Sequence, residues 1–319
     1  MKAFSFILIL LLFSQLRVSS QTCCSGGVPV SGSVGLYPLN TKGFQINLSY
    51  DLNSLNTLKN YSKTLPGNER ERTTRSILME ASYSLTERLS LYGFVSYVSQ
   101  KREINNIGYN DVALTEGIGD AVLMPGYLLV DRFSFSWYFS AGIKFPLGKA
   151  DIRNDDGILI NPDLQPGSGA YDALVFNMFR YEAARGHSFW NSFALRETGT
   201  NSDFRVSDQY SFGNEIVTAF GWSKNILFLN VIIEPSASVS YRYAGNDLIN
   251  QDEIPNTGGN WLFASSGIAI FIKENLKLFS SFSFPLFSKP AGVQLTTSYR
   301  FNAGIYFSFQ NNRNKFLNI

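Results

Sequence analysis

The chain has 319 residues, of which 45% are hydrophobic and 15% aromatic, and it carries a formal net charge of +2 at pH 7. A charge so close to zero provides no electrostatic surface for nucleic acid, so that class of partner is excluded. No segment reaches the roughly 20 consecutive apolar residues of a membrane-spanning helix, and any membrane crossing must therefore be made by strands. The cysteines, Cys23 and Cys24, are adjacent, which rules out a long-range disulfide framework within one chain.

Residues 1–20 have the pattern of a signal peptide. Lys2 supplies a positive start, Phe4–Phe13 is almost wholly apolar, and small residues ending at Ser20 provide a cleavage site. The segment holds two of the 27 basic residues and no acidic one, so its removal leaves 25 basic against 25 acidic side chains. A lipoprotein signal with an acylated Cys23 is the less favoured alternative, because serine rather than an aliphatic residue lies three positions before that cysteine.

Strict alternation of apolar and polar residues begins at Phe44 and continues to Asn53. Successive residues of a strand point to opposite faces, and a barrel wall needs apolar side chains toward lipid and polar ones toward water. The same period marks 76–85, where Leu78 is the one exception, as well as 133–145 and 227–243. Weaker candidates lie at 89–100, 117–130, 169–182, 188–197, 208–222, 260–272, 276–287 and 293–309. We therefore predict an all-β, transmembrane, antiparallel up-and-down β-barrel of about twelve strands over residues 43–309.

The connections between these segments alternate in length. Outer-membrane barrels keep short turns in the periplasm and long loops outside, so the pattern predicts an even strand count with both termini in the periplasm. Pro125 and Pro285 interrupt two strands, where we expect bulges or strand ends. Short links fall near Glu87, Asp131, Gly186, Lys224 and Glu274, and long ones near 54–73, 101–116, 147–168, 198–207 and 244–259.

Two segments flank the predicted barrel. Residues 21–42 are assigned to an N-terminal periplasmic or lumenal segment, and within it 28–36 alternate in polarity, which is compatible with a plug or with a disordered arm. The last strand alternates from Phe301 to Phe309, the kind of C-terminal strand with which outer-membrane barrels commonly end. We expect the barrel-assembly machinery to be a partner, and we assign 310–319 to a C-terminal periplasmic tail.

Three short motifs in the middle third of the chain occur in a fixed order. They are Gly117, Gly119 and Asp120; then Gly142, Lys144, Pro146 and Gly148; then Leu164, Gln165, Pro166, Gly167, Ser168 and Gly169, followed by Asp172. In these pieces the chain resembles the bacterial outer-membrane phenol-degradation meta-pathway transporter-like proteins, although Leu147 replaces the threonine usual between proline and glycine. The resemblance implies a barrel that handles hydrophobic or aromatic compounds.

Ionisable residues on the polar face of the strands are candidates for function, because charge at membrane depth has to face water or a partner. They could line a narrow pore or form a salt-bridge network in a closed interior. The aromatic residues Tyr37, Tyr50, Trp137, Trp190, Trp222 and Trp261 favour interfacial girdles over a ligand cage. The inward-facing candidates are Glu80, Lys144, Glu215, Glu234, Arg242 and Arg300.

No motif predicts an enzyme, a cofactor or a metal. His187 lies beside Ser188 and near Asn191, but the predicted periplasmic turn is the wrong end for phospholipase chemistry. The acidic loop at 151–163 has oxygen ligands for calcium, yet an EF-hand template anchored at Gly157 puts Ile152 at the first ligand position. We predict a transport barrel in the outer membrane that contacts lipid and a small hydrophobic solute. The alternative is a closed structural barrel with a salt-bridged interior and partner-binding outer loops.

Overall fold

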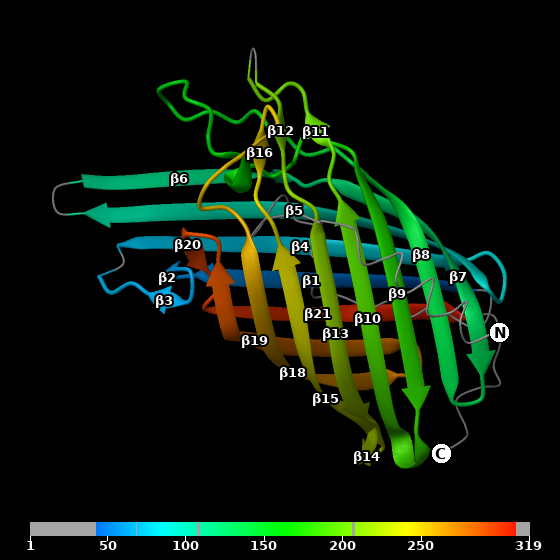
Figure 1. Ribbon diagram of the computed structural model, residues 1–319. Helices are drawn as coiled ribbons and strands as arrows, with labels where there is room; N and C mark the ends of the chain where they lie inside the picture. The colour runs from blue at the N-terminus through cyan, green and yellow to red at the C-terminus, as the bar shows by residue number, and fades with distance from the viewer. Residues whose placement is uncertain (1–42, 68, 107–108, 206–207, 311–319) are drawn as a thin grey trace, which may run out of the picture.

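The computed structural model describes residues 43–310 apart from 68, 107–108 and 206–207. In this part of the chain twelve wall positions close into an antiparallel barrel (Figure 1). β6 and β7 share one position, because both pair with β5. The wall consists of β1 (Gly43–Leu55), β4 (Arg70–Ser84), β5 (Leu89–Asn106), β6 (Tyr109–Ile118) with β7 (Ala121–Arg132), β8 (Phe135–Phe145), β9 (Asp172–Glu182), β10 (His187–Glu197), β13 (Glu215–Lys224), β15 (Val231–Ala244), β18 (Gly259–Lys273), β19 (Leu276–Pro290) and β21 (Tyr299–Gln310).

The barrel closes between its first and last strands. β1 pairs with β21 over its length, from Gly43 opposite Gln310 to Ser54 opposite Tyr299. Each strand pairs with the next along the wall, including β13 with β15. The first strand therefore starts at the end where the last one finishes, and the predicted even strand count is confirmed.

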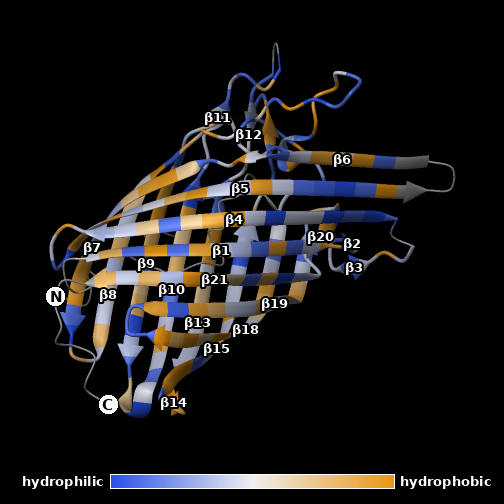
Figure 2. Cartoon of the chain, turned by 180° about the vertical axis from the view of Figure 1, so that it is seen from behind, coloured by the Kyte–Doolittle hydropathy of each residue, from blue (hydrophilic) through white to orange (hydrophobic). Residues whose placement is uncertain are grey.

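The burial of side chains is inverted relative to a soluble protein. On β1 the polar Gln45 is 1% exposed, whereas the apolar Leu48 and Tyr50 are 48% and 41% exposed. Figure 2 shows this alternation as successive hydrophobic and hydrophilic bands along β1 and β4. Soluble proteins bury their large apolar residues, and a wall with lipid outside exposes them instead. The predicted all-β transmembrane barrel is confirmed. Within the described residues, no helix has the length and apolar character needed to cross a membrane.

The two ends of the barrel differ in their connections. One, the short-turn end, has connections at 85–88, 133–134, 183–186, 225–230 and 274–275, which include the 3-10 turn η3 (Ala184–Gly186) and the short β14 (Ile226–Phe228). The other, the long-loop end, has loops with two small sheets and the 3-10 turn η2 (Pro162–Leu164). The small sheets are β2 (Thr57–Asn60), β3 (Lys63–Thr64) and β20 (Val293–Thr296), and β11 (Thr200–Asn201), β12 (Tyr210–Ser211), β16 (Leu248–Ile249) and β17 (Asp252–Glu253).

The prediction of a long loop at 101–116 is wrong. β5 and β6 continue to pair up to Asn106 opposite Tyr109, so the segment is a long hairpin that projects beyond the wall (Figure 1). Arg102 forms an ion pair with Asp111 across this hairpin at 3.1 Å. Charged residues fill the far part of β5 in place of apolar ones, which is why the alternation signal ends near residue 100 (Figure 2).

Two other strand boundaries differ from the prediction. The segment 227–243 is broken by a tight turn at Leu229 and Asn230, whose φ angles are 46° and 65°. Leucine rarely adopts positive φ, so the first residue of this turn gives no signal in the sequence. The final strand begins at Tyr299 rather than at 293, because β20 leaves the wall and pairs with β2.

The two prolines have different outcomes. At Pro285 the register shifts between Leu262 and Phe263 of the neighbouring strand, and the predicted bulge is confirmed. β7 instead runs through Pro125, whose carbonyl accepts a hydrogen bond from Ser140 at 2.8 Å, and its register shift lies at Leu128 and Val130. The predicted signal peptide, the segment 21–42 and residues 311–319 of the tail lie outside the described residues.

Candidate functional site

The three sequence motifs converge at one point on the inner wall, near the long-loop end. Asp120 lies at the break between β6 and β7, and its side chain is fully buried. Its Oδ1 accepts a hydrogen bond from the Gly148 amide at 3.2 Å. Its Oδ2 accepts from the Ser168 amide at 3.0 Å and from the Ser168 hydroxyl at 2.7 Å. One carboxylate therefore joins all three motifs.

Lys144 is the cation of this point. Its Nζ lies 3.0 Å from Asp120 Oδ2 and 2.8 Å from Asp172 Oδ2, and it donates a hydrogen bond to the Ser168 hydroxyl. All four side chains are buried. A buried ion pair offsets its desolvation cost only when the geometry is good and the remaining donors are satisfied. Here one ammonium is shared by two carboxylates and a hydroxyl, which satisfies its three donors.

Glycines allow segments of the backbone to come into direct contact here. A Cβ on Gly148 would lie 2.6 Å from Gly167 Cα, and one on Gly167 would lie 2.6 Å from Gly148 Cα. A Cβ on Gly119 would collide with the Ser96 hydroxyl. β8 ends directly before Pro146, which lacks the amide hydrogen that a strand needs. The glycine pattern is thus a requirement of close packing.

The connection from β8 to β9, residues 146–171, folds against the inner wall, and we name it the inward loop. Arg72 of β4 forms an ion pair with Asp163 at 2.6 Å. Gln100 of β5 donates from Nε2 to the Gln165 carbonyl at 3.1 Å. Thr115 of β6 donates to the Leu164 carbonyl. The loop is therefore tied to three neighbouring wall strands.

Gln165 also fixes the shape of the inward loop itself. Its side chain accepts from the Ile152 amide at 3.0 Å and donates to the carbonyls of Ile152 and Ile160, each at 2.9 Å. Its side chain is buried. The acidic loop that the sequence suggested as a calcium alternative is thus organised around an amide, and its Asp163 is held by Arg72. Pro166 packs beside Gly117, whose Cβ would lie 3.4 Å away, and Gly169 is in the left-handed region at φ 72°.

Charges of alternating sign continue from Lys144 around the inner wall, and we name the set the charge belt. Asp172 lies 3.8 Å from Arg196, Arg196 lies 3.4 Å from Glu215, and Arg242 donates to Glu215. The Arg242 guanidinium lies over the Trp261 ring at 5.1 Å. The members of the belt, from the break between β6 and β7 to β15, are Asp120, Lys144, Asp172, Arg196, Glu215 and Arg242.

The structure groups three of the six predicted inward charges and separates the others. Lys144, Glu215 and Arg242 belong to the charge belt. Arg300 instead pairs with Asp51 at 2.8 Å, and Glu234 accepts from the Ser223 hydroxyl at 2.8 Å.

Glu80 is buried away from the charge belt. It accepts hydrogen bonds from Asn47 at 2.6 Å and from Tyr92 at 2.9 Å. Sequence reasoning missed Arg196, although its spacing of two and four from Ala194 and Ser192 places it on the polar face of β10.

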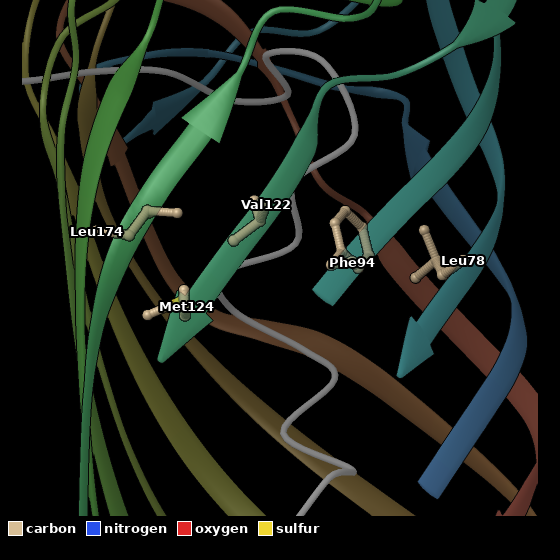
Figure 3. Packing of buried hydrophobic residues seen from close by; sticks show 5 residues of the cluster. All are labelled: Leu78, Phe94, Val122, Met124 and Leu174. Carbon is tan, nitrogen blue, oxygen red and sulfur yellow. The ribbon is translucent and has the colours of Figure 1, made fainter. Parts of the chain in front are cut away.

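Apolar side chains also lie on the inner face. Figure 3 shows one group on β4, β5, β7 and β9. Tyr92 and Phe176 pack against this group. A second group on β7, β8 and β9 has Phe176 and Trp190 against it, so Phe176 joins the two. Leu78, the exception in its segment, belongs to the first group. The first group is Leu78, Phe94, Val122, Met124 and Leu174, and the second is Leu128, Tyr138 and Met178.

The aromatic girdle prediction is wrong for two tryptophans. Trp190 packs against the second apolar group, and Trp261 is fully buried beneath Arg242. Both therefore lie on the inner face. Tyr50 is on the outer face, and Trp137 and Trp222 alternate with buried inner residues of their strands, as a girdle requires. Tyr37 lies outside the described residues.

The histidine lies at the short-turn end. His187 is the first residue of β10, and its Nδ1 accepts a hydrogen bond from Trp222 Nε1 at 3.0 Å. Ser188 points to the opposite face of the strand, and Asn191 donates to the Ala219 carbonyl at 3.0 Å. The three residues therefore do not converge.

The long loops 198–214 and 245–258 pack together next to the inward loop, and we name them the lobe. Asp247 is buried, accepts from the Tyr210 hydroxyl, and accepts from the Gly213 amide at 3.2 Å. Burial, and then the Asp247 carboxylate, raise the pKa of Tyr210 well above its ordinary value. Phe204, Tyr210 and Phe212 form an apolar cluster that also contacts Leu159 of the inward loop. The lobe thus supports the loop from above.

No family model matches the chain. No curated protein matches it in sequence. Among solved structures, it is similar to an outer membrane channel from Pseudomonas putida F1, with a TM-score of 0.68, 12% identity, and coverage of 87% of this chain and 98% of that chain. The β domain of the Bordetella autotransporter BrkA has a TM-score of 0.49 and 9% identity, with coverage of 84% of this chain and 100% of that chain. The KdgM porin has a TM-score of 0.41 and 8% identity, with coverage of 83% of this chain and 99% of that chain. Both likenesses are too weak to add evidence. The fold is that of an outer-membrane β-barrel, as predicted.

Proposed function

We propose that this barrel is an outer-membrane channel that passes small, largely apolar solutes, aromatic ones included, without a chemical step. The observation that carries the proposal is the pair of joined apolar groups on the inner wall between β4 and β10. The inner face of a water-filled barrel is normally polar. The members of the two groups are themselves buried, and the partly buried Tyr92, Phe176 and Trp190 that pack against them are the aromatic side chains that a solute can contact. Contact with these rings favours a solute that loses water contacts as it moves along the wall.

The inward loop supports a selective entrance. It is tied to β4, β5 and β6 on the inner side, at the end with the long loops, so its position sets the width of the mouth. The apolar groups begin next to it, because Val122 is two residues beyond Asp120. A solute that clears the loop would therefore meet the apolar wall directly. The described likeness to an outer membrane channel agrees with this class of function.

A second candidate is a closed barrel whose outer loops bind partners. The charge belt favours it, because six alternating charges with little exposure can fill an interior without any pathway. The lobe around Asp247 would then be the binding surface.

Reconstitution of the purified full chain distinguishes the two candidates. The channel predicts conductance in planar bilayers and swelling of liposomes in phenyl glucoside that exceeds swelling in glucose, a control of similar polarity without the ring. Neither conductance nor swelling above protein-free liposomes would contradict the channel.

Charge-removing variants separate the two candidates further. Replacing Glu80 and Glu234, which lie outside the charge belt, with glutamine should change permeation with heat resistance on gels largely kept if the barrel is a channel. The closed barrel predicts loss of heat resistance instead, because its interior depends on these charges.

A further inference from the structure

One inward cation differs from all the others in its surroundings. Lys277 is the second residue of β19, at the short-turn end, and lies in register with Phe271 of β18 and Tyr306 of β21. Its Nζ lies 5.5 Å from the centre of the Phe271 ring and 4.9 Å from that of the Tyr306 ring. The ammonium is therefore framed by two aromatic faces on neighbouring strands.

Lys277 also lacks a carboxylate at salt-bridge distance within the described part of the chain. The inward cations Arg72, Lys144, Arg196, Arg242 and Arg300 each have one. The carboxylate with the strongest electrostatic effect on Lys277 is that of Glu234, which already accepts a hydrogen bond from the Ser223 hydroxyl at 2.8 Å. Lys277 is only partly buried, and its ammonium has three donors with two ring faces as its contacts on the neighbouring strands, so donors remain for a ligand.

A second cation lies near Lys277. Arg180 on β9 acts electrostatically on the Lys277 ammonium, and the ion-pair partner of Arg180, Glu182, is more than half exposed. Arg180 donates to Ser188 at 3.3 Å, and Ser188 pairs in register with Ser223 next to Glu234. The inner wall at this end thus brings Lys277 and Arg180 near the partly buried Glu234 and the hydroxyl groups of Ser188 and Ser223.

We infer that the rim around Lys277 is a binding station for aromatic carboxylates. The carboxylate of such a ligand would accept from the ammonium, which contributes a charge-assisted hydrogen bond, and its ring would pack on Phe271 and Tyr306. The second apolar group, with Trp190, lies on the facing stretch of the same inner wall and offers further contact. The inference names a solute class for the proposed channel and so rests on that function, but the binding it predicts can be measured without transport.

The experiment is a ¹⁹F NMR titration of the full chain in detergent micelles at pH 8. The probes are 4-fluorobenzoate and its neutral counterpart 4-fluorobenzyl alcohol, each referenced to micelles without protein. Wild-type protein should bind the benzoate more tightly than the alcohol. Lys277→Gln should weaken benzoate binding by about tenfold or more, the usual worth of a charged hydrogen bond, and leave the alcohol unchanged. Lys277→Arg should retain most of the affinity.

Lys289→Gln is the matched control, because Lys289 is an exposed lysine near the other end of the same strand. Acetate, which has no ring, should compete poorly with the benzoate in wild-type protein, a test that needs no variant. Equal benzoate affinity in wild type and Lys277→Gln would overturn the inference, and so would equal weakening of both probes or absence of benzoate binding to wild type. Failure of liposome swelling with benzoate binding intact would instead count against the channel alone.

Discussion

Gly148 and Gly167 cross with their backbones in contact, so that a Cβ on either would lie 2.6 Å from the other's Cα. The two residues are 19 positions apart and belong to opposite ends of the inward loop. Asp120 accepts hydrogen bonds from the amides of Gly148 and of Ser168, which follows Gly167. One buried carboxylate therefore holds both backbone segments of the crossing. The loop is thus closed at its base before any contact of its tip is made.

Gly167→Ala should therefore loosen the inward loop. The methyl group has only backbone to displace, and overpacking of this kind costs about 1–3 kcal/mol. We expect faster protease cleavage within 150–165 and a higher single-channel conductance. Gly93→Ala is the control, because its Cβ would meet nothing nearer than 3.9 Å and should change neither property. An unchanged loop in Gly167→Ala would show that the crossing is not needed for its position.

Lys144→Met tests the charge belt. The substitution leaves Asp120 and Asp172 buried without their shared cation, and removal of one partner of a buried pair costs about 3–5 kcal/mol. We expect the temperature at which the barrel unfolds on gels to fall clearly. Adding Asp172→Asn should restore part of the loss, because it removes one uncompensated charge. Lys289→Met, at an exposed site, should have no effect, and an equal loss there would contradict the assignment.

Arg72→Ala tests whether the inward loop limits the mouth. The change removes the ion pair with Asp163 while Gly148, Gly167 and Asp120 keep the base of the loop in place. We expect a higher conductance with little loss of heat resistance. Asp163→Asn should act in the same direction but more weakly, because Arg72 also donates to Gln100 and to the Asp163 carbonyl. The double variant should add little to Arg72→Ala, since that variant already removes the ion pair. Additive effects would mean that the two residues act separately.

The alternation of polarity could predict the wall because every second residue of a strand faces lipid and the residues between them face water. It placed Lys144, Glu215 and Arg242 on the inner face, but periodicity has no information about the partner across a strand, and so the charge belt did not emerge from it. Arg196 was missed although the same period places it on the polar face. The turn at Leu229 was missed because its φ of 46° is unusual for leucine. The inward fold of the loop was missed because Gln165 and Arg72, both polar, read as solvated residues in sequence.

The lobe of long loops should have its own dependence on pH. The pKa of Tyr210 is raised in the folded lobe, by burial and by Asp247, above the value of about 10 that the unfolded chain has. A folded pKa above the unfolded one stabilises the lobe fully below pH 10, and this contribution is lost progressively as pH rises above 10. We expect hydrogen exchange of amides in 198–214 and 245–258 to accelerate above pH 10 relative to the wall strands.

Tyr210→Phe removes the titrating hydroxyl but leaves the buried Asp247 short of a donor. Exchange should therefore already be faster at pH 8, and its rise above pH 10 should be smaller than in wild type. The exposed Tyr61, in the β2–β3 turn, provides the control as Tyr61→Phe, which should keep the wild-type profile. If exchange in Tyr210→Phe accelerated above pH 10 as much as in the wild-type protein, another group would have to titrate in the lobe.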